Sequence, residues 1–284
     1  MENFKEKVII ALDYDNLDAA RGILERLKGE AYFYKIGPVL FTSCGIQSIE
    51  LVRDYGCKIF LDLKFHDIPN TVYRAVKSAG ELGVDIINVH ASGGAEMMKS
   101  AKKGGVEAAK RAGKSIDVIA VTILTSLAQE DLRDIFYYPR DEINSSGLKP
   151  YSGVFGGVGN LVLHLAELAK ISGLDGIVCS GYESLEIKKV LGDNFKTIVP
   201  GIRLAGGGYA AEVQRDAGAA ITPKGENIKG AAWIDDQKRV MTPSMAFNSK
   251  ADYIVVGREI TASNDPLTAL KAIYNDIERF AERT

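Results

Sequence analysis

Hydrophobic and polar positions follow one another along this chain in a repeated order: a short apolar run, then a longer stretch with helical spacing. Eight apolar runs have the length and β-branched content of buried strands. They are Val8–Asp13, Tyr32–Gly37, Lys58–Lys64, Val84–His90, Asp117–Leu124, Gly176–Ser180, Lys196–Ile202 and Asp252–Gly257. The stretch Asn16–Lys28 places its apolar residues on one helical stripe before Gly29, and a last helix is predicted over Pro266–Arg283.

Eight strand–helix units favour a closed parallel (β/α)8 barrel, the TIM barrel, over an open doubly wound sheet. The 284 residues are enough for this barrel to form as a single catalytic domain over residues 1–284. Two connections interrupt the rhythm, residues 126–160 after the fifth strand and residues 204–236 after the seventh. Loops of this length in a compact domain are usually either functional or disordered. Both leave the predicted catalytic face, so we favour extended βα5 and βα7 loops that close over a site, with mere decoration as the alternative.

Charged residues gather where the third strand ends. Strand alternation places Asp62 and Lys64 on one face, and Asp67 follows in a turn fixed by Pro69. The carboxyl ends of barrel strands converge on one mouth, so we expect this group to meet other polar strand-end residues there. These residues are Asp13, Lys35, His90, Thr122, Arg203 and Arg258. The alternative explanation is a structural ion pair in the barrel core.

The last two strands end in motifs suited to a phosphate group. Pro200-Gly201-Ile202-Arg203 ends the seventh strand, and Val256-Gly257-Arg258 ends the eighth. Barrels commonly bind phosphate through the loops after strands seven and eight, where backbone N–H groups and a guanidinium fork suit its oxygens. The two motifs therefore predict a phosphate site.

Composition excludes several partners and cofactors. A formal net charge of −2 gives no electrostatic case for nucleic acid, and no apolar stretch is long enough to span a membrane. The first residues lack the apolar region of a signal peptide, and Cys44, Cys57 and Cys179 are scattered as expected for reduced thiols. We therefore expect a cytoplasmic protein. The three histidines show no metal-ligand spacing, so no metal site is expected.

Several motifs occur together in a specific order. Residues 62–71 read Asp-x-Lys-x-x-Asp-Ile-Pro-Asn-Thr, and residues 236–243 read Asp-Gln-Lys-Arg-Val-Met-Thr-Pro. With Ala11-Leu12-Asp13, Tyr34-Lys35-Ile36-Gly37, Val121–Ser126 and the two phosphate motifs, this order resembles the orotidine 5′-phosphate decarboxylase family over nearly the whole chain.

The resemblance implies a carboxy-lyase without a cofactor that converts orotidine 5′-monophosphate to UMP and CO₂, the last step of pyrimidine nucleotide biosynthesis. It implies a charged tetrad of Lys35, Asp62, Lys64 and Asp67. It also implies a homodimer with shared active sites, in which Asp67, Ile68 and Thr71 reach the neighbouring subunit's site. The remaining implied contacts are Asp13 and Lys35 to the ribose, Thr125 to the pyrimidine, Gln237, Gly257 and Arg258 to the phosphate, and Pro200 and Arg203 beside it.

Two other functions stay open at this point. A metal-dependent sugar-phosphate decarboxylase of the same barrel group shares the Asp-x-Lys-x-x-Asp pattern, although Ile68–Thr71 and the Gln237 motif argue against it. A barrel that binds a nucleotide as a sensor, without catalysis, is the second alternative. The long segment Leu204–Asp235 also departs from compact members of the family, so the contacts of that loop are the least transferable.

Overall fold

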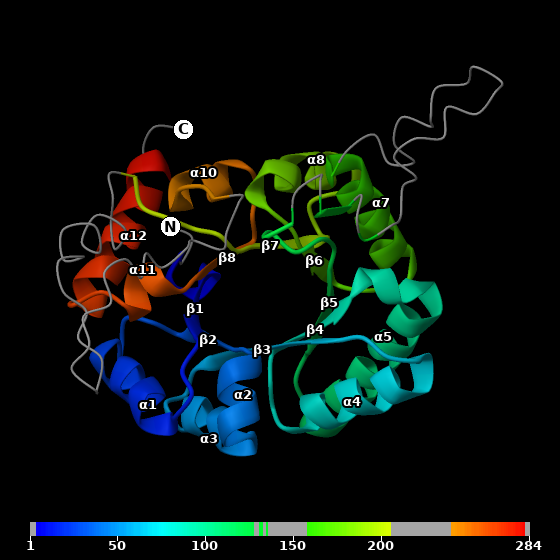
Figure 1. The fold of residues 1–284 in the computed structure, drawn as a ribbon, viewed down its shortest axis with the longest axis horizontal. Coiled ribbons are helices and arrows are strands. Elements are labelled where there is room, and N and C mark those ends of the chain that lie inside the picture. The colour runs from blue at the N-terminus through cyan, green and yellow to red at the C-terminus, as the bar shows by residue number, and fades with distance from the viewer. Residues whose placement is uncertain (1–3, 128–130, 133–134, 136–157, 206–239, 282–284) are drawn as a thin grey trace.

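Eight parallel strands close into a barrel in chain order, with β8 pairing back to β1 (Figure 1). The computed structural model describes residues 4–127, 131–132, 135, 158–205 and 240–281. The strands are β1 (Val8–Leu12), β2 (Phe33–Ile36), β3 (Lys58–Phe65), β4 (Ile86–His90), β5 (Asp117–Val121), β6 (Gly176–Val178), β7 (Lys196–Val199) and β8 (Tyr253–Val256). The eight predicted strands and the barrel are confirmed, with ends that differ by up to three residues.

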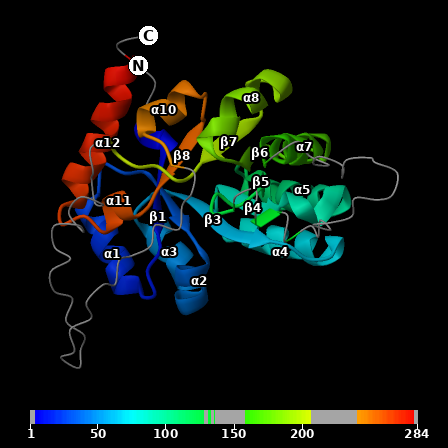
Figure 2. The same cartoon turned by 45° about the horizontal axis from the view of Figure 1, so that its top comes forward.

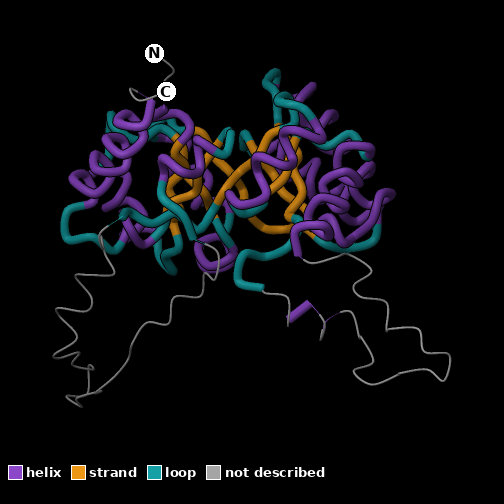
Figure 3. Tube along the Cα trace, turned by 90° about the horizontal axis from the view of Figure 1, so that it is seen from above, coloured by secondary structure: helices purple, strands orange, loops and turns teal. Residues whose placement is uncertain are grey.

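Helices lie outside the strands and cover them on all sides (Figures 1 and 3). They are η1 (Phe4–Lys7), α1 (Leu17–Arg26), α2 (Pro38–Cys44), α3 (Ile46–Asp54), α4 (Pro69–Glu81), η2 (Ala91–Gly93), α5 (Gly94–Ala112), α7 (Val158–Ile171), α8 (Gly181–Leu191), α10 (Pro243–Asn248), α11 (Arg258–Thr261) and α12 (Pro266–Ala281). Asn16 caps α1, because its side chain accepts the N–H of Ala19. Helix α12 lies beside α1 and completes the ring (Figure 2).

The two long connections predicted from the sequence occupy the expected places. One runs from β5 to α7 and the other from β7 to α10. Most of each, residues 136–157 and 206–239, lies outside the described residues. The expectation that these loops close over the site therefore stays a prediction.

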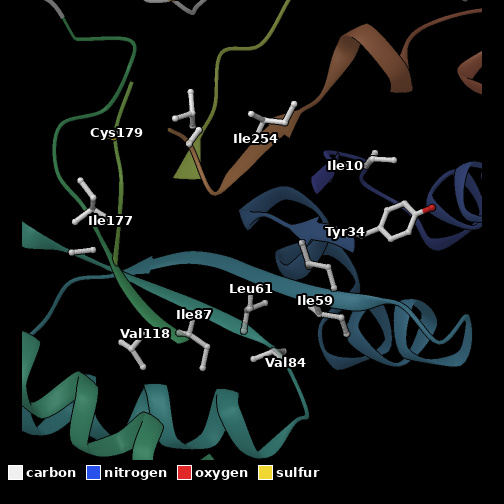
Figure 4. Close-up of a cluster of buried hydrophobic side chains, with 14 of the residues drawn as sticks. Ile10, Tyr34, Ile59, Leu61, Val84, Ile87, Val118, Ile177, Cys179 and Ile254 are labelled. Atoms are coloured by element: carbon white, nitrogen blue, oxygen red, sulfur yellow. The ribbon is translucent and has the colours of Figure 1, made fainter. Parts of the chain in front are cut away.

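Strand alternation divides the core into two apolar layers. Outward-facing residues such as Ile10, Tyr34 and Leu61 belong to the larger cluster, which includes the helices' buried faces (Figure 4). Residues of the opposite parity form a separate buried cluster that fills the barrel interior: Ile9, Ala11, Phe33, Phe60, Ile86, Ile119, Ile198 and Val255. The interior is therefore a packed plug, and chemistry is confined to the mouth above it.

Aspartates tie the strands together at the amino-terminal end of the barrel. Asp85, Asp175 and Asp252 each directly precede an even-numbered strand. Their carboxylates accept the backbone N–H groups of Ile59, Val118 and Thr197, on the preceding odd-numbered strands, at 2.7–2.8 Å. Each also pairs with a lysine, namely Lys114, Lys102 and Lys188, at 2.6–2.8 Å. These contacts stabilise the pairing of neighbouring strands at the end of the barrel opposite the mouth.

Helices α4 and α5 approach one another closely because glycines line their contact. A Cβ added to Gly104 on α5 would lie 2.4 Å from the carbonyl oxygen of Tyr73 on α4. One added to Gly80 on α4 would lie 2.5 Å from the Cβ of Ala108. The packing matters for the mouth, because α4 begins directly after residues 66–68 and holds that segment in place.

We expect Gly104→Ala to lower the free energy of unfolding by about 1–3 kcal/mol, since the new methyl group meets backbone that cannot yield cheaply. Gly22→Ala is the control, because an added Cβ at that position on α1 meets nothing within 4 Å. It should raise the free energy of unfolding by up to about 1 kcal/mol through helix propensity. Urea unfolding of both variants measures this, and equal stability of the two would contradict the close approach.

Candidate active site

A chain of alternating charges runs along one side of the barrel mouth, from β1 to β3, and centres on the carboxylate of Asp62. The Nζ of Lys64 lies 2.7 Å from Oδ1 of Asp62, and the Nζ of Lys35 lies 3.0 Å from Oδ2. Lys35 also lies 3.3 Å from Oδ1 of Asp13. Four of the residues predicted to meet at the mouth, from strands β1, β2 and β3, are therefore in contact.

The apolar plug forms the floor of this cluster. Lys35 lies two residues beyond Phe33 on β2, and Asp62 lies two residues beyond Phe60 on β3. Side chains two apart on a strand share a face, so both charged groups stand directly above aromatic rings that fill the interior. Asp62 is only 7% exposed. A carboxylate this far from water requires partners, and the two ammonium groups supply them.

The charge pairing outweighs the effect of burial on both groups. Burial favours the neutral form of Asp62, but Lys35, Lys64 and the hydrogen bonds to it hold the pKa of the Asp62 carboxyl below its ordinary value. Burial likewise favours neutral Lys35, but the carboxylates of Asp62 and Asp13 raise the pKa of Lys35 above its ordinary value. Both groups are therefore ionised at neutral pH.

Lys64 takes an uncommon backbone conformation. Its φ is +51°, in the left-handed region that residues with a Cβ seldom occupy. The register of β3 against β4 shifts between Leu61 and Phe65, so Lys64 lies within this irregularity. Strand alternation correctly predicted that Asp62 and Lys64 meet, but the distorted backbone had no signal in the sequence.

Sequence reasoning missed one residue of the cluster, Asn88 on β4. Its Nδ2 donates to Oδ1 of Asp62 at 2.6 Å, and its Oδ1 accepts the backbone N–H of Lys64 at 2.8 Å. Alternation along β4 places Asn88 on the same interior face as Ile86. A polar residue on the inward face of an otherwise apolar strand was the signal that could have identified it.

Asp67, Ile68 and Thr71, which follow β3, are all exposed in the single chain. Asp67 is exposed, and its Oδ1 accepts the N–H of Ile68 at 2.6 Å. The Ile68 residue is 68% exposed at the start of α4, and Thr71 is exposed on its first turn. Within the described residues, no ion pair joins Asp67 to Lys35 or Lys64, the two lysines that contact Asp62.

Two histidines border the cluster. The ring centroids of His66 and His90 lie 5.5 Å apart at the ends of β3 and β4. Burial, reinforced by the nearby His66 and Lys64, lowers the pKa of His90. His90 lies at the end of β4, as the sequence predicted, and its ring is neutral at neutral pH.

The opposite side of the mouth carries the groups predicted for a phosphate. Arg203 follows β7, and its Nε lies 3.8 Å from Oε1 of Glu259, which is 4% exposed on α11. Arg258 begins α11, and Gly257 directly precedes it. Pro200 and Gly201 lead from β7 to Arg203, and Gly201 has a φ of +77°. The two arginines are thus carried by neighbouring strands, β7 and β8.

Two further predicted residues differ in what the structure says of them. Thr125 lies in the turn after β5 and is 7% exposed. Gln237 lies outside the described residues, so its predicted phosphate contact is not placed.

In the described part of the chain, no three His, Cys, Asp or Glu side chains gather as a metal site would require. No described helix is long and apolar enough to cross a membrane.

The whole chain is similar to known decarboxylases. The family model described as "Orotidine 5′-phosphate decarboxylase / HUMPS family" matches residues 6–231 and 224–273. The orotidine 5′-phosphate decarboxylase of Saccharophagus degradans is 39% identical over 273 residues, covering 96% of this chain and 95% of that protein. That of Chromobacterium violaceum is 40% identical over 273 residues, covering 96% of this chain and 92% of that protein.

Solved structures agree with the sequence relatives. Orotidine 5′-phosphate decarboxylase from Lactobacillus acidophilus matches with a TM-score of 0.69 and 34% identity, over 95% of this chain and 98% of that chain. An uncharacterized conserved protein from Geobacillus kaustophilus matches with a TM-score of 0.71 and 29% identity, over 95% of this chain and 99% of that chain. The chain therefore belongs to the orotidine 5′-phosphate decarboxylase / HUMPS family.

Proposed function

We propose that this protein is an orotidine 5′-phosphate decarboxylase, which converts orotidine 5′-monophosphate to UMP and CO₂ without a cofactor. The observation that carries this proposal is the Asp62 carboxylate held between Lys35 and Lys64 at the mouth of a family barrel. The arrangement offers a fixed ammonium group and a fixed carboxylate side by side. This suits a reaction in which the substrate carboxylate leaves as CO₂ and the carbon that carried it is protonated.

Lys64 is the proposed proton donor. Cleavage of the bond between C6 and the substrate carboxylate leaves an electron pair on C6 of the pyrimidine. The ammonium of Lys64 stabilises this developing charge, then gives its proton to C6 and regains one from solvent. Its distance of 2.7 Å from Asp62 supports this role, because Asp62 is the group proposed to face the departing carboxylate.

Asp62 is proposed to face the substrate carboxylate. Two carboxylates in a poorly hydrated site repel one another, and that repulsion is relieved as neutral CO₂ leaves. Lys35 offsets the charge of Asp62 from the other side at 3.0 Å. Lys35 also offers a donor to the ribose hydroxyls, and the Asp13 carboxylate, 3.3 Å from it, offers an acceptor.

The remaining contacts follow the family pattern. Thr125 is proposed to contact the pyrimidine from the turn after β5. Gln237, the Gly257 amide and Arg258 are proposed to bind the phosphate, with Pro200 and Arg203 beside it. Arg203 leads into the long segment between β7 and α10, whereas Arg258 directly follows β8 and Gly257, so Arg258 is the stronger candidate for the direct phosphate contact.

We propose a homodimer in which Asp67, Ile68 and Thr71 complete the partner's site. The high exposure of Ile68 supports this, because a large apolar side chain next to the mouth lacks cover in the single chain. Asp67 would then supply the fourth charge of the tetrad in trans. We further propose that residues 1–284 form one barrel domain, and that the enzyme works in the cytoplasm, where its three free thiols stay reduced.

The direct test is ultraviolet spectroscopy of orotidine 5′-monophosphate mixed with the purified protein. The absorbance of the substrate should change to that of UMP, and the rate should be the same with and without EDTA. Unchanged absorbance would favour a nucleotide sensor. Activity abolished by EDTA would favour the metal-dependent alternative.

Lys64→Ala should lower kcat at least about 10²–10⁴-fold, the usual contribution of a general acid, and leave UMP binding in place. Lys58→Ala is the matched control, since Lys58 lies on the same strand at its far end and pairs with Glu6 at 2.9 Å. Steady-state kinetics and UMP titration measure both variants. Near-normal turnover by Lys64→Ala would reject its role as proton donor.

Arg258→Ala should weaken UMP binding about 10–100-fold, the loss expected when one charge-assisted hydrogen bond is removed. Uridine, which lacks the phosphate, should bind both proteins equally. Calorimetric titration with the two ligands isolates the phosphate contact. An equal loss of affinity for uridine and UMP would show that Arg258 acts elsewhere.

Mixing Lys64→Ala subunits with Asp67→Ala subunits should restore activity in the mixed dimer, because one of its two sites then has both residues intact. Lys64→Ala mixed with Asp62→Asn is the control, since both of those residues belong to the same subunit's half of each site. Activity is measured on dimers isolated with two affinity tags. No recovery in the first pairing would exclude shared sites.

A further inference from the structure

Asn88 holds an unusual position among the side chains at the barrel mouth. It is fully buried on β4, with 0% exposure. Burying an amide in an apolar interior is unfavourable unless both its donor and its acceptor find partners. Here they do, through Asp62 at 2.6 Å and the Lys64 backbone N–H at 2.8 Å.

The two partners fix which way the amide points. The Asp62 carboxylate only accepts hydrogen bonds, and the Lys64 N–H only donates. The NH₂ group of Asn88 must therefore face Asp62, and its oxygen must face Lys64. A single neutral side chain thus connects the buried carboxylate with the main chain of the proposed proton donor.

The bond to Lys64 falls where the backbone most needs support. A left-handed conformation at a residue with a Cβ costs about 1–2 kcal/mol and persists only where surrounding contacts hold it. Lys64, at φ +51°, lies in the register shift of β3 against β4, and Asn88 projects from β4 into that shift. The same backbone conformation lets the Lys64 ammonium reach back to Asp62 Oδ1, the oxygen that Asn88 also contacts.

We propose that Asn88 is the positioning residue that sets the geometry of the proton donor, by holding the Asp62 carboxylate and the Lys64 main chain in one fixed arrangement. The inference rests on the proposed decarboxylase activity. Asn88 need not touch the substrate, and it adds no charge to the site. Its effect should therefore appear in the chemical step, and affinity for the nucleotide should change little.

Two substitutions at Asn88 separate its two bonds. Asn88→Ala removes both. Asn88→Asp keeps the shape and the acceptor for Lys64 but, when ionised, places a second carboxylate against Asp62. Protonated Asp at position 88 would restore the original pattern, because its O–H donates to Asp62 and its C=O accepts from Lys64. Two carboxyl groups this close raise the pKa of one of them, so protonation should begin in weakly acidic solution.

The experiment measures kcat and UMP affinity for the wild type and both variants between pH 8 and about pH 5, a range above the ordinary aspartate pKa. Asn88→Ala should lose about 10²-fold in kcat, the scale expected for a donor displaced by roughly 1 Å, and keep UMP affinity within about threefold. Asn88→Asp should be similarly slow at pH 8. It should recover relative to the wild type as the pH falls.

Thr197→Val on β7 controls for the loss of a buried polar group, since Thr197 is fully buried and its hydroxyl contacts Ser184 at 3.0 Å, away from the mouth. It should lower thermal stability and leave kcat unchanged.

Turnover by Asn88→Asp that parallels the wild type at every pH would overturn the proposal. So would equal losses of kcat and UMP affinity. If Asn88→Ala does not fold, the isosteric Asn88→Asp variant still decides the question. Failure of the wild type to consume orotidine 5′-monophosphate would reject the proposed function instead.

Discussion

A single buried carboxylate, that of Asp62, determines how the rest of the barrel mouth is arranged. Its charge is unfavourable in a poorly hydrated place, and the apolar plug beneath it offers no compensation. The charge is balanced by Lys35 on β2 and Lys64 within β3, and Asn88 on β4 donates a hydrogen bond to the same carboxylate. Lys35, Lys64 and Asn88 all contact the two carboxylate oxygens of Asp62. If any of the three moved away, the buried carboxylate would lose a partner that stabilises its charge. The constraint that stabilises Asp62 therefore also aims the Lys64 ammonium.

The two ends of the barrel use the same residue types for different purposes. At the amino-terminal end, Asp85, Asp175 and Asp252 each join a backbone N–H to a lysine, and so connect neighbouring strands. At the mouth, Asp62 instead pairs with two lysines, Lys64 on its own strand and Lys35 on the neighbouring β2, and Lys64 occupies a left-handed backbone conformation that ordinary strands avoid. Of the two described non-glycine residues with positive φ, Lys64 lies at the mouth where we place the chemistry, and Lys250 lies at the opposite end, in the turn from α10 to β8.

Periodicity predicted much of this protein. Runs of β-branched residues marked all eight strands, and alternation with strand-end placement brought Asp13, Lys35, Asp62 and Lys64 together. Asn88 escaped because an uncharged amide inside an apolar run resembles any buried polar group. The backbone of Lys64 escaped because lysine, unlike glycine, carries no sequence signal for positive φ. The fifth strand was drawn too long because Ile123 and Leu124 continue the apolar run after the chain has turned. The proposed trans contact of Asp67 rests only on family resemblance, since the pattern of one chain does not reveal its partner.

Asp62 should be ionised, and shared by two lysines, before any substrate binds. Carboxyl NMR of the enzyme labelled with ¹³C-aspartate tests this directly, with Asp62→Asn used to assign the resonance. Because the pKa of Asp62 is lowered, its carboxylate should stay ionised, with a constant shift, as the pH falls to about 4, where an ordinary aspartate is already about half protonated. Proton uptake by Asp62 at or above that pH would show that the two lysines do not hold it ionised.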